Sequence, residues 1–135
     1  MKRTQWTIEI PKALPSFNTW DGWHHRKQTR EKKEVWYPLV MEACYGLTFK
    51  KIPTPCTLRA TVYHKLSRRR DCPNMGTPLD KLILDALTEP QDGNERGLGV
   101  LPDDDCRHLR EVTLIVQPEK AEADATVLVF RRYRG

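Results

Sequence analysis

The sequence lacks any apolar run that approaches the roughly 20 residues needed to cross a bilayer. Its first residues, Met1–Trp6, are mostly polar and contain no apolar signal core, so we expect a protein of the cytoplasm without a membrane partner. Internal repeats and low-complexity segments are also absent. Together these absences exclude transmembrane and solenoid architectures from the expected fold classes.

Closely spaced cysteine pairs are missing as well. The four cysteines are Cys44, Cys56, Cys72 and Cys106, whereas structural zinc sites usually present two cysteines only about two to four residues apart. A zinc site made by Cys72, Cys106 and His108 remains an alternative. We favour reduced thiols and an ordinary histidine, because disulfides rarely persist in the cytoplasm.

The size and charge of the chain fit one basic domain spanning residues 1–135. The 135 residues suffice for a single core, and 39% of them are apolar, with a mean hydropathy of −0.66. Lys and Arg number 23 against 18 Asp and Glu, which gives a net charge of +5 and a pI near 9.1. This balance favours a polyanionic partner.

Hydrophobic periodicity predicts a small α/β (α+β) domain: a mixed sheet of about four strands with two main helices packed on it. Alternating apolar residues predict strands, and apolar residues three and four apart predict helices. The expected strands are 5–10, 56–66, 109–117 and 125–133, and the expected helices are 30–45 and 79–88. We expect the last two strands to form an antiparallel hairpin, Pro38 to kink the first helix or divide it near Tyr37, and Gly46 to end it.

Residues 12–30 are predicted to form a long loop that combines aromatic and basic side chains. It contains Trp20 and Trp23, followed by the basic run His24–Lys27 and by Arg30. Aromatic rings interleaved with cations are typical of surfaces that stack on bases and bind phosphates. The alternative is that both tryptophans pack over the sheet and that the charges form a solvated face.

Chemically informative residues concentrate between Ser67 and His108. Three arginines precede Asp71 just beyond a predicted strand, and an acidic run, Asp103–Asp105, lies beyond the second predicted helix. Carboxylates brought together from two loops would repel one another until a divalent cation bridges them, and oxygen ligands suit Mg²⁺. The alternatives are a helix cap or turn for Asp71 and a solvated turn for the acidic run, in which Asp105 can cap the next segment of the chain.

These residues resemble the RusA-type crossover junction endodeoxyribonucleases, which are common in phages and prophages. The similarity rests on Arg68–Asp71, on the pattern Leu-x-Lys-x-x-x-Asp-Ala-Leu-Thr at 79–88, and on Leu-Pro-Asp-Asp at 101–104. The segment Pro15–Asn18 is also similar to that family's proline-serine-x-asparagine loop.

The resemblance implies a Holliday junction resolvase: a homodimeric, Mg²⁺-dependent endonuclease that hydrolyses phosphodiesters symmetrically in four-way DNA junctions. Its products would be nicks with 5′-phosphate and 3′-hydroxyl ends, made during recombination, repair or phage DNA processing in a bacterial or phage-infected cell. The implied catalytic residues are Asp71, Asp104, Lys81 and Asp103, and the implied metal ligands are Asp71, Asp104, Asp103 and Asp80. The DNA-binding residues are expected to be Asn18, Arg26, Lys27, Arg30, Arg68, Arg69 and Arg70. Lys81 can alternatively form a surface ion pair with Asp85, four residues away.

The chain departs from the family pattern at one position. The family usually has a second acid two residues after the first, and here that place holds Pro73, with Asn74 next to it. Asp80 or Asn74 can supply the missing oxygen ligand. A protein that binds branched DNA with weak or no cleavage is therefore the alternative function. An RNA-binding module is a third interpretation, which no recognised RNA motif supports.

Overall fold

The predicted fold class is confirmed: a four-stranded mixed sheet carries a layer of helices. The computed structural model describes residues 4–65, 76–88, 90 and 97–134. The strands are β1 (Gln5–Ile10), β2 (Cys56–His64), β3 (Leu109–Lys120) and β4 (Ala125–Arg132), in the spatial order β1-β4-β2-β3. β4 pairs antiparallel with both β1 and β2, and β2 pairs parallel with β3.

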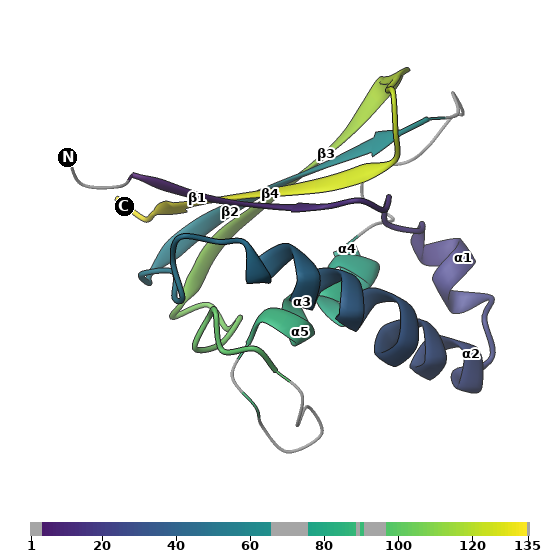
Figure 1. The fold of residues 1–135 in the computed structure, drawn as a ribbon, viewed down its shortest axis with the longest axis horizontal. Helices are drawn as coiled ribbons and strands as arrows, with labels where there is room; N and C mark the ends of the chain where they lie inside the picture. The colour runs from purple at the N-terminus through teal and green to yellow at the C-terminus, as the bar shows by residue number, and fades with distance from the viewer. Residues whose placement is uncertain (1–3, 66–75, 89, 91–96, 135) are drawn as a thin grey trace.

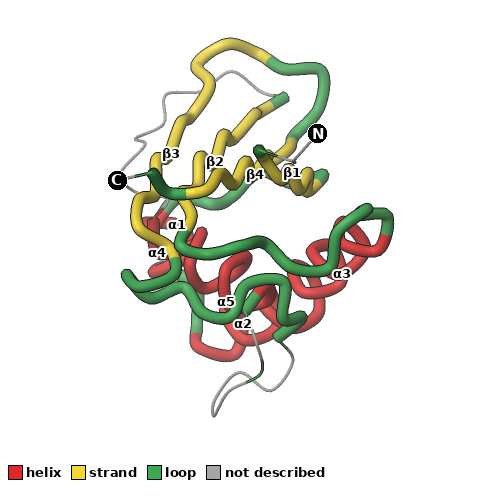
Figure 2. The backbone as a smooth tube through the Cα atoms, turned by 90° about the vertical axis from the view of Figure 1, so that its left-hand side faces the viewer, coloured by secondary structure: helices red, strands yellow, loops and turns green. Residues whose placement is uncertain are grey.

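The helices form two continuous runs, 25–45 and 76–87, and one separate short helix, 17–21. They are α1 (Phe17–Asp21), α2 (His25–Arg30), η1 (Glu31–Trp36), α3 (Tyr37–Tyr45), α4 (Gly76–Pro78), η3 (Leu79–Leu84) and α5 (Asp85–Leu87), where η denotes π-helical winding. The helices lie on one face of the sheet and, within the described part of the chain, none covers the other (Figures 1 and 2). Among the described residues, no helix is long and apolar enough to cross a membrane.

Alternation along the strands decides which face of the sheet the helices cover. In β1, Trp6, Ile8 and Ile10 are buried while Thr7 and Glu9 are exposed. In β2 every second side chain from Cys56 to His64 is buried in the same way. Because successive side chains in a strand point to opposite faces, these residues give the sheet one apolar side on which the helices pack.

The predicted hairpin between the last two strands is wrong, because β2 lies between β3 and β4. β3 continues beyond Gln117 to Lys120, and the short connection then passes the end of β2. The connection is held there by two hydrogen bonds, from Ala121 N to His64 O (2.9 Å) and from Lys65 N to Asp124 Oδ1 (2.7 Å). A short connection predicts that two strands are near neighbours, and it does not reveal whether a third lies between them.

The predicted loop over residues 12–30 is also wrong, since it contains α1 and α2. Ser16 begins α1 by accepting a hydrogen bond from the Thr19 N–H through its hydroxyl (3.2 Å), as an N-cap does. The buried Trp20 ring meets the Trp23 ring edge-on, with centroids 5.8 Å apart, and both pack against the core. For the tryptophans, the packing alternative is therefore the correct one.

The first long helical run is continuous from 25 to 45, and at Tyr37, next to Pro38, only its winding changes from π to α. Before this point the backbone is π-helical, and the Tyr37 N–H donates to Lys32 O, five residues earlier. Pro38 lies in the first turn of α3, directly after the π-helical winding, and has no N–H to donate to the preceding turn. Gly46 ends α3, as predicted.

The second helical run begins at Gly76 rather than Leu79 and ends at Leu87. Its predicted apolar stripe is confirmed as core: Leu79, Leu82, Ile83, Ala86 and Leu87 are all buried. The middle half of the run, η3, is π-helical, and the Asp85 N–H donates to Asp80 O. The stripe fixes the run against the core and η1, and its polar side remains available for chemistry.

Replacing Ile83 with alanine should lower the free energy of unfolding by about 3 kcal/mol, because the side chain is fully buried and its removal leaves a cavity. Chemical denaturation measures the effect. The matched control is Tyr45→Ala, since Tyr45 is 83% exposed and its loss should change stability by less than about 0.5 kcal/mol. Equal losses in the two variants would contradict the burial of Ile83 in the core.

Candidate metal centre

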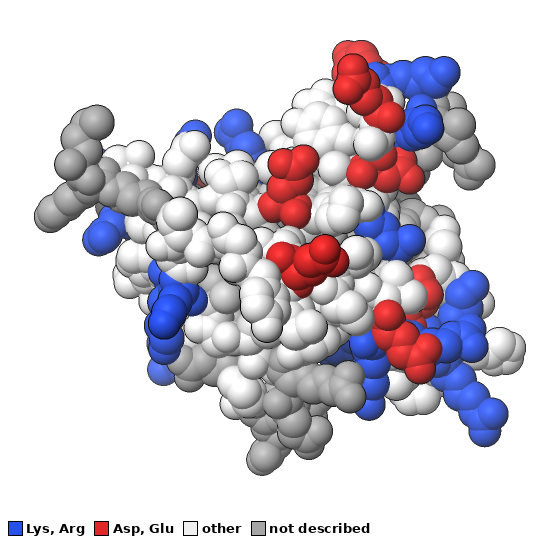
Figure 3. All heavy atoms as spheres, viewed as in Figure 1, with Lys and Arg blue, Asp and Glu red and all other residues white. Residues whose placement is uncertain are grey.

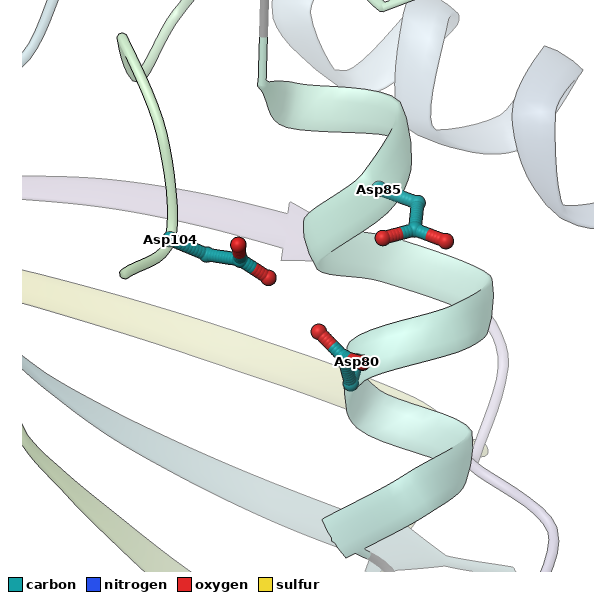
Figure 4. Close-up of side chains that lie close together, drawn as sticks. All are labelled: Asp80, Asp85 and Asp104. Carbon is teal, nitrogen blue, oxygen red and sulfur yellow. The ribbon is translucent and has the colours of Figure 1, made fainter. Parts of the chain in front are cut away.

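Three carboxylates from two separate parts of the chain meet beside the second helical run. They belong to Asp80 in η3, Asp85 in α5 and Asp104 in the segment that leads into β3. One oxygen from each lies within 4.8 Å of the others, and all three side chains are partly buried. Figure 4 shows Asp104 reaching from its loop toward the two helical residues.

The π-helical winding explains why Asp80 and Asp85 face the same site. In an α-helix with about 3.6 residues per turn, residues five apart differ by roughly 140° around the axis. Winding with i→i+5 hydrogen bonds brings such residues onto adjacent turns of one face. The bond from the Asp85 N–H to Asp80 O has this spacing, so the local backbone itself aligns the two carboxylates.

The crowding raises the pKa of Asp104 to about 7. The largest cause is a hydrogen bond with Asp80, then burial, and then the negative charges of Asp80 and Asp103. Two carboxylates can share a hydrogen bond only if one carries a proton, so the metal-free site favours a protonated Asp104. Asp103 lies directly beside this pair, since its Oδ1 accepts the Asp104 N–H at 2.7 Å.

Two lysines border the acidic cluster. Lys32 Nζ lies 2.8 Å from Asp85 Oδ2, which joins the two helical runs. Lys81 Nζ lies 3.9 Å from Asp80 Oδ2, and both side chains are about half exposed, so this pair is weak. The lysines also line a pocket of about 270 Å³ together with Trp20, His25, Gln28 and Thr29. A substrate in this pocket would therefore lie next to the carboxylates.

Asp105 takes a different role from its two acidic neighbours. Its carboxylate accepts the Arg107 N–H at 3.2 Å and lies 2.7 Å from His108 Nδ1, which agrees with the predicted cap. The bond with His108, helped by Arg107, lowers the Asp105 pKa to about 2. Of the residues considered for zinc, Cys106 is exposed, His108 is engaged by Asp105, and Cys72 lies outside the described residues.

The structure brings together three of the predicted site residues in the acidic cluster: Asp80 and Asp104, with Asp103 alongside. Lys81 lies beside them, 3.9 Å from Asp80. Several other predicted residues fall outside the described part of the chain: Arg68, Arg69, Arg70, Asp71, Pro73 and Asn74.

The predicted DNA-binding residues of α1 and α2 lie at the surface. They are Asn18, Arg26, Lys27 and Arg30, and all four are exposed. Lys and Arg side chains gather at the lower right of Figure 3, where Figure 1 places α2. The Lys27 ammonium lies 4.9 Å from the centre of the Trp23 ring, which leaves its charge on the surface.

Sequence reasoning missed Asp85 as a cluster member and Lys32 as its partner. The sequence assigned Asp85 only a possible pairing with Lys81, because α-helical spacing places those two residues on one face. No sequence signal marks the π-helical winding that turns Asp85 toward Asp80. Lys32 was visible only as one cation in a basic run, and its contact with Asp85 joins residues 53 positions apart.

Comparison with protein-family models and with curated proteins gives no match to the chain. The resemblance to RusA-type nucleases therefore stays a prediction from the sequence. Among the described residues the cluster offers carboxylate oxygens as metal ligands, and this donor set fits hard cations such as Mg²⁺ better than zinc.

We compare the thermal midpoints of the wild-type protein and of Asp104→Asn in chelator. The wild-type midpoint minus the variant midpoint should fall as the pH rises from about 4 to about 7. The folded state holds the Asp104 proton up to a pKa of about 7, whereas the unfolded chain releases it near 3.8. The Asp104 carboxyl therefore stabilises the folded state fully below a pH of about 3.8, and this stabilisation is lost as the pH rises through about 7. Thermal unfolding across this range measures it.

The control for this pH series is Asp105→Asn. The Asp105 pKa is lowered to about 2, so its contribution is already complete above the unfolded value of 3.8 and is lost only as the pH falls. Both proteins of this control pair also carry His108→Gln, because His108 contacts the Asp105 carboxylate and an imidazole changes charge in this pH range. The midpoint difference for Asp105→Asn should thus be flat between pH values of about 5 and 7. The same flat result for Asp104→Asn would mean that Asp104 does not share a proton with Asp80.

Proposed function

We propose that this protein is a Mg²⁺-dependent endodeoxyribonuclease that cuts four-way DNA junctions, a Holliday junction resolvase of the RusA type. The supporting observation is the meeting of Asp80, Asp85 and Asp104 within 4.8 Å beside Lys32 and Lys81. Carboxylates this close are suited to holding a divalent cation, because a cation relieves their mutual repulsion. The adjoining lysines are suited to a polyanionic substrate.

In this proposal Asp80, Asp85 and Asp104 hold Mg²⁺, with Asp103 beside them, and the resemblance adds Asp71 to the ligands. The ion supplies Lewis-acid chemistry, which neutralises charge on the scissile phosphate and activates water. Water oxygen attacks phosphorus, the bond to the 3′ oxygen breaks, and that oxygen leaves as a hydroxyl after taking a proton. Lys81 stabilises the extra negative charge that develops on the phosphate oxygens.

The DNA strand would approach through the pocket beside the carboxylates. Lys32 and Lys81 border both the pocket and the acidic cluster, so a phosphate between them would face the metal site. The exposed cations of α2 would extend this contact along the backbone, and the resemblance adds Arg68, Arg69 and Arg70.

A homodimer completes the proposal, acting in the cytoplasm of a bacterium or phage-infected cell. A four-way junction is two-fold symmetric and must be cut at two paired positions, which two identical sites related by a dyad provide. Sedimentation of the protein with a junction should give two chains per junction. A complex with one chain per junction would contradict the dimer without excluding cleavage.

The alternative is a protein that binds branched DNA without cutting it. The ion pair between Lys32 and Asp85 favours this second function, because a lysine already neutralises one of the three carboxylates. A metal would have to displace that lysine to use Asp85 fully. The two functions differ in what Mg²⁺ does once the junction is bound.

Purified protein should nick a synthetic four-way junction, in preference to linear duplex, when Mg²⁺ is present and not in chelator. Asp80→Asn and Asp104→Asn should each retain junction binding and lose on the order of 100-fold or more in nicking rate, because each removes a ligand charge. Gel analysis of nicked strands and gel shifts in chelator measure the two properties.

The matched control for cleavage is Asp105→Asn. It removes one negative charge next to Asp104, and its carboxylate is engaged by Arg107 and His108 rather than by the cluster. We expect wild-type nicking from this variant. A wild-type protein that shifts the junction equally with and without Mg²⁺, and never nicks it, would overturn the proposal in favour of a binding protein.

A further inference from the structure

A second charged hollow lies at the end of the sheet where β4 ends. It has a volume of about 310 Å³ and is lined by Thr4, Thr57, Arg131, Arg132 and Arg134. Thr57 and Arg131 are direct partners in the β2–β4 register. Both alternate with buried residues that point toward the helices, so they belong to the open face of the sheet.

The arginines of this hollow make neutral contacts within the described part of the chain. Arg131 Nη2 donates to Gln5 Oε1 at 3.2 Å, and the Arg132 guanidinium lies 5.8 Å from the centre of the Trp6 ring. A further arginine, Arg110, lies over the Tyr133 ring at 4.7 Å. On the face shown in Figure 3, Lys and Arg occur without Asp or Glu at the left end, where Figure 1 places the end of β4.

This arrangement is chemically suited to phosphate. Guanidinium groups present several donors in a planar fork that matches phosphate oxygens, and threonine hydroxyls add further donors. The neutral contacts with Gln5 and Trp6 restrain two of the side chains without neutralising their charge. Like charges gathered in one hollow repel one another, and a bound polyanion relieves that repulsion.

The hollow lies at the end of the sheet that the acidic segment enters. Cys56 pairs with Leu109 of β3 on one side and with Arg132 of β4 on the other. The Cys56 N–H also donates to His108 O at 2.8 Å, only a few residues after Asp104. A strand bound near the carboxylates could thus continue around this end of the sheet to reach the arginines.

We infer that the hollow formed by Arg131, Arg132 and Arg134 with Thr4 and Thr57 is a second phosphate-binding site, which holds the backbone of a nucleic acid strand apart from the acidic cluster. The inference rests on the proposed function, because it takes a branched DNA as the ligand. The inferred site would bind a segment of that DNA outside the strand that is cut. Arg132 follows the alternation to the helix-facing side of the sheet, where it meets Trp6, so the hollow spans the end of the sheet and not its open face alone.

The test measures junction affinity of the full-length protein in chelator by fluorescence anisotropy, over a series of salt concentrations. The variant combines Arg131→Gln, Arg132→Gln and Arg134→Gln. Its affinity should fall by about tenfold or more, and the slope of log affinity against log salt should become shallower by about 2 to 3, as each lost phosphate contact releases about one counterion fewer.

The matched control removes three positive charges elsewhere, with Lys50→Gln, Lys65→Gln and Lys120→Gln at exposed positions. It should keep a slope close to wild type, and thermal unfolding shows that both triple variants are folded. Equal changes in the two would overturn the inference, because they would reflect net charge alone. The proposed function would survive that result, since it fails only if the wild-type protein does not nick the junction.

A site for free phosphate ions would behave differently from a site for backbone phosphates. Inorganic phosphate would then raise the thermal midpoint of the wild-type protein and not that of the arginine variant, while both bound the junction with equal affinity. That pair of results would overturn backbone binding. Lower junction affinity in the arginine variant, together with little protection by inorganic phosphate, supports it.

Discussion

One oxygen from each of three carboxylates lies within 4.8 Å of the others, and the mutual repulsion of these carboxylates is the main constraint on the structure. Ionised carboxylates at such distances favour separation, so the surrounding fold must hold them together or a proton or cation must neutralise them. The buried stripe of the second helical run fixes Asp80 and Asp85, and Lys32 neutralises Asp85. The raised pKa of Asp104 keeps a proton between the acids.

The sheet topology explains how distant parts of the chain reach one site. β2 and β3 are parallel neighbours, and a parallel pair requires a crossover, which here includes the helical run 76–87. Two of the carboxylates lie on that crossover helix and the third lies on the return to β3. The site is therefore a product of the β–helix–β unit and needs no contribution from β1 or β4 to bring its carboxylates together.

Much of the fold could be predicted from the sequence because it depends on periodicity. The alternation of Trp6, Ile8 and Ile10 and the apolar stripe from Leu79 to Leu87 each determine a buried face, and the structure confirms both. Strand order could not be predicted in the same way. Residues 109–133 alone do not show whether β3 and β4 form a hairpin or lie on either side of β2. The strand between them, β2, lies about 50 residues earlier in the chain.

The acidic cluster was only partly predictable, for a related physical reason. The family pattern predicts Asp104, and Asp80 is predicted as the replacement for the acid missing at Pro73; the structure brings the two together. Asp85 is predicted on the polar side of the helix but not as a member of the cluster, because α-helical spacing does not align it with Asp80, whereas the π-helical backbone does. Local propensity does not predict α1, because the helix is held by the packing of its buried Trp20 on the core. It does not predict α2 either, because α2 has no buried residue and is the start of the run that continues into η1.

The position of β3 has a consequence for how firmly the site is held. Among the described strands, β3 pairs with β2 alone, and Val112 on it is 46% exposed. An outer strand with one neighbour frays more readily than an inner one, and Asp104 is carried by the segment that leads into it. A cation bound by Asp104 together with Asp80 and Asp85 would hold the start of β3 against the second helical run. Occupancy of the centre and the rigidity of β3 would thereby be coupled.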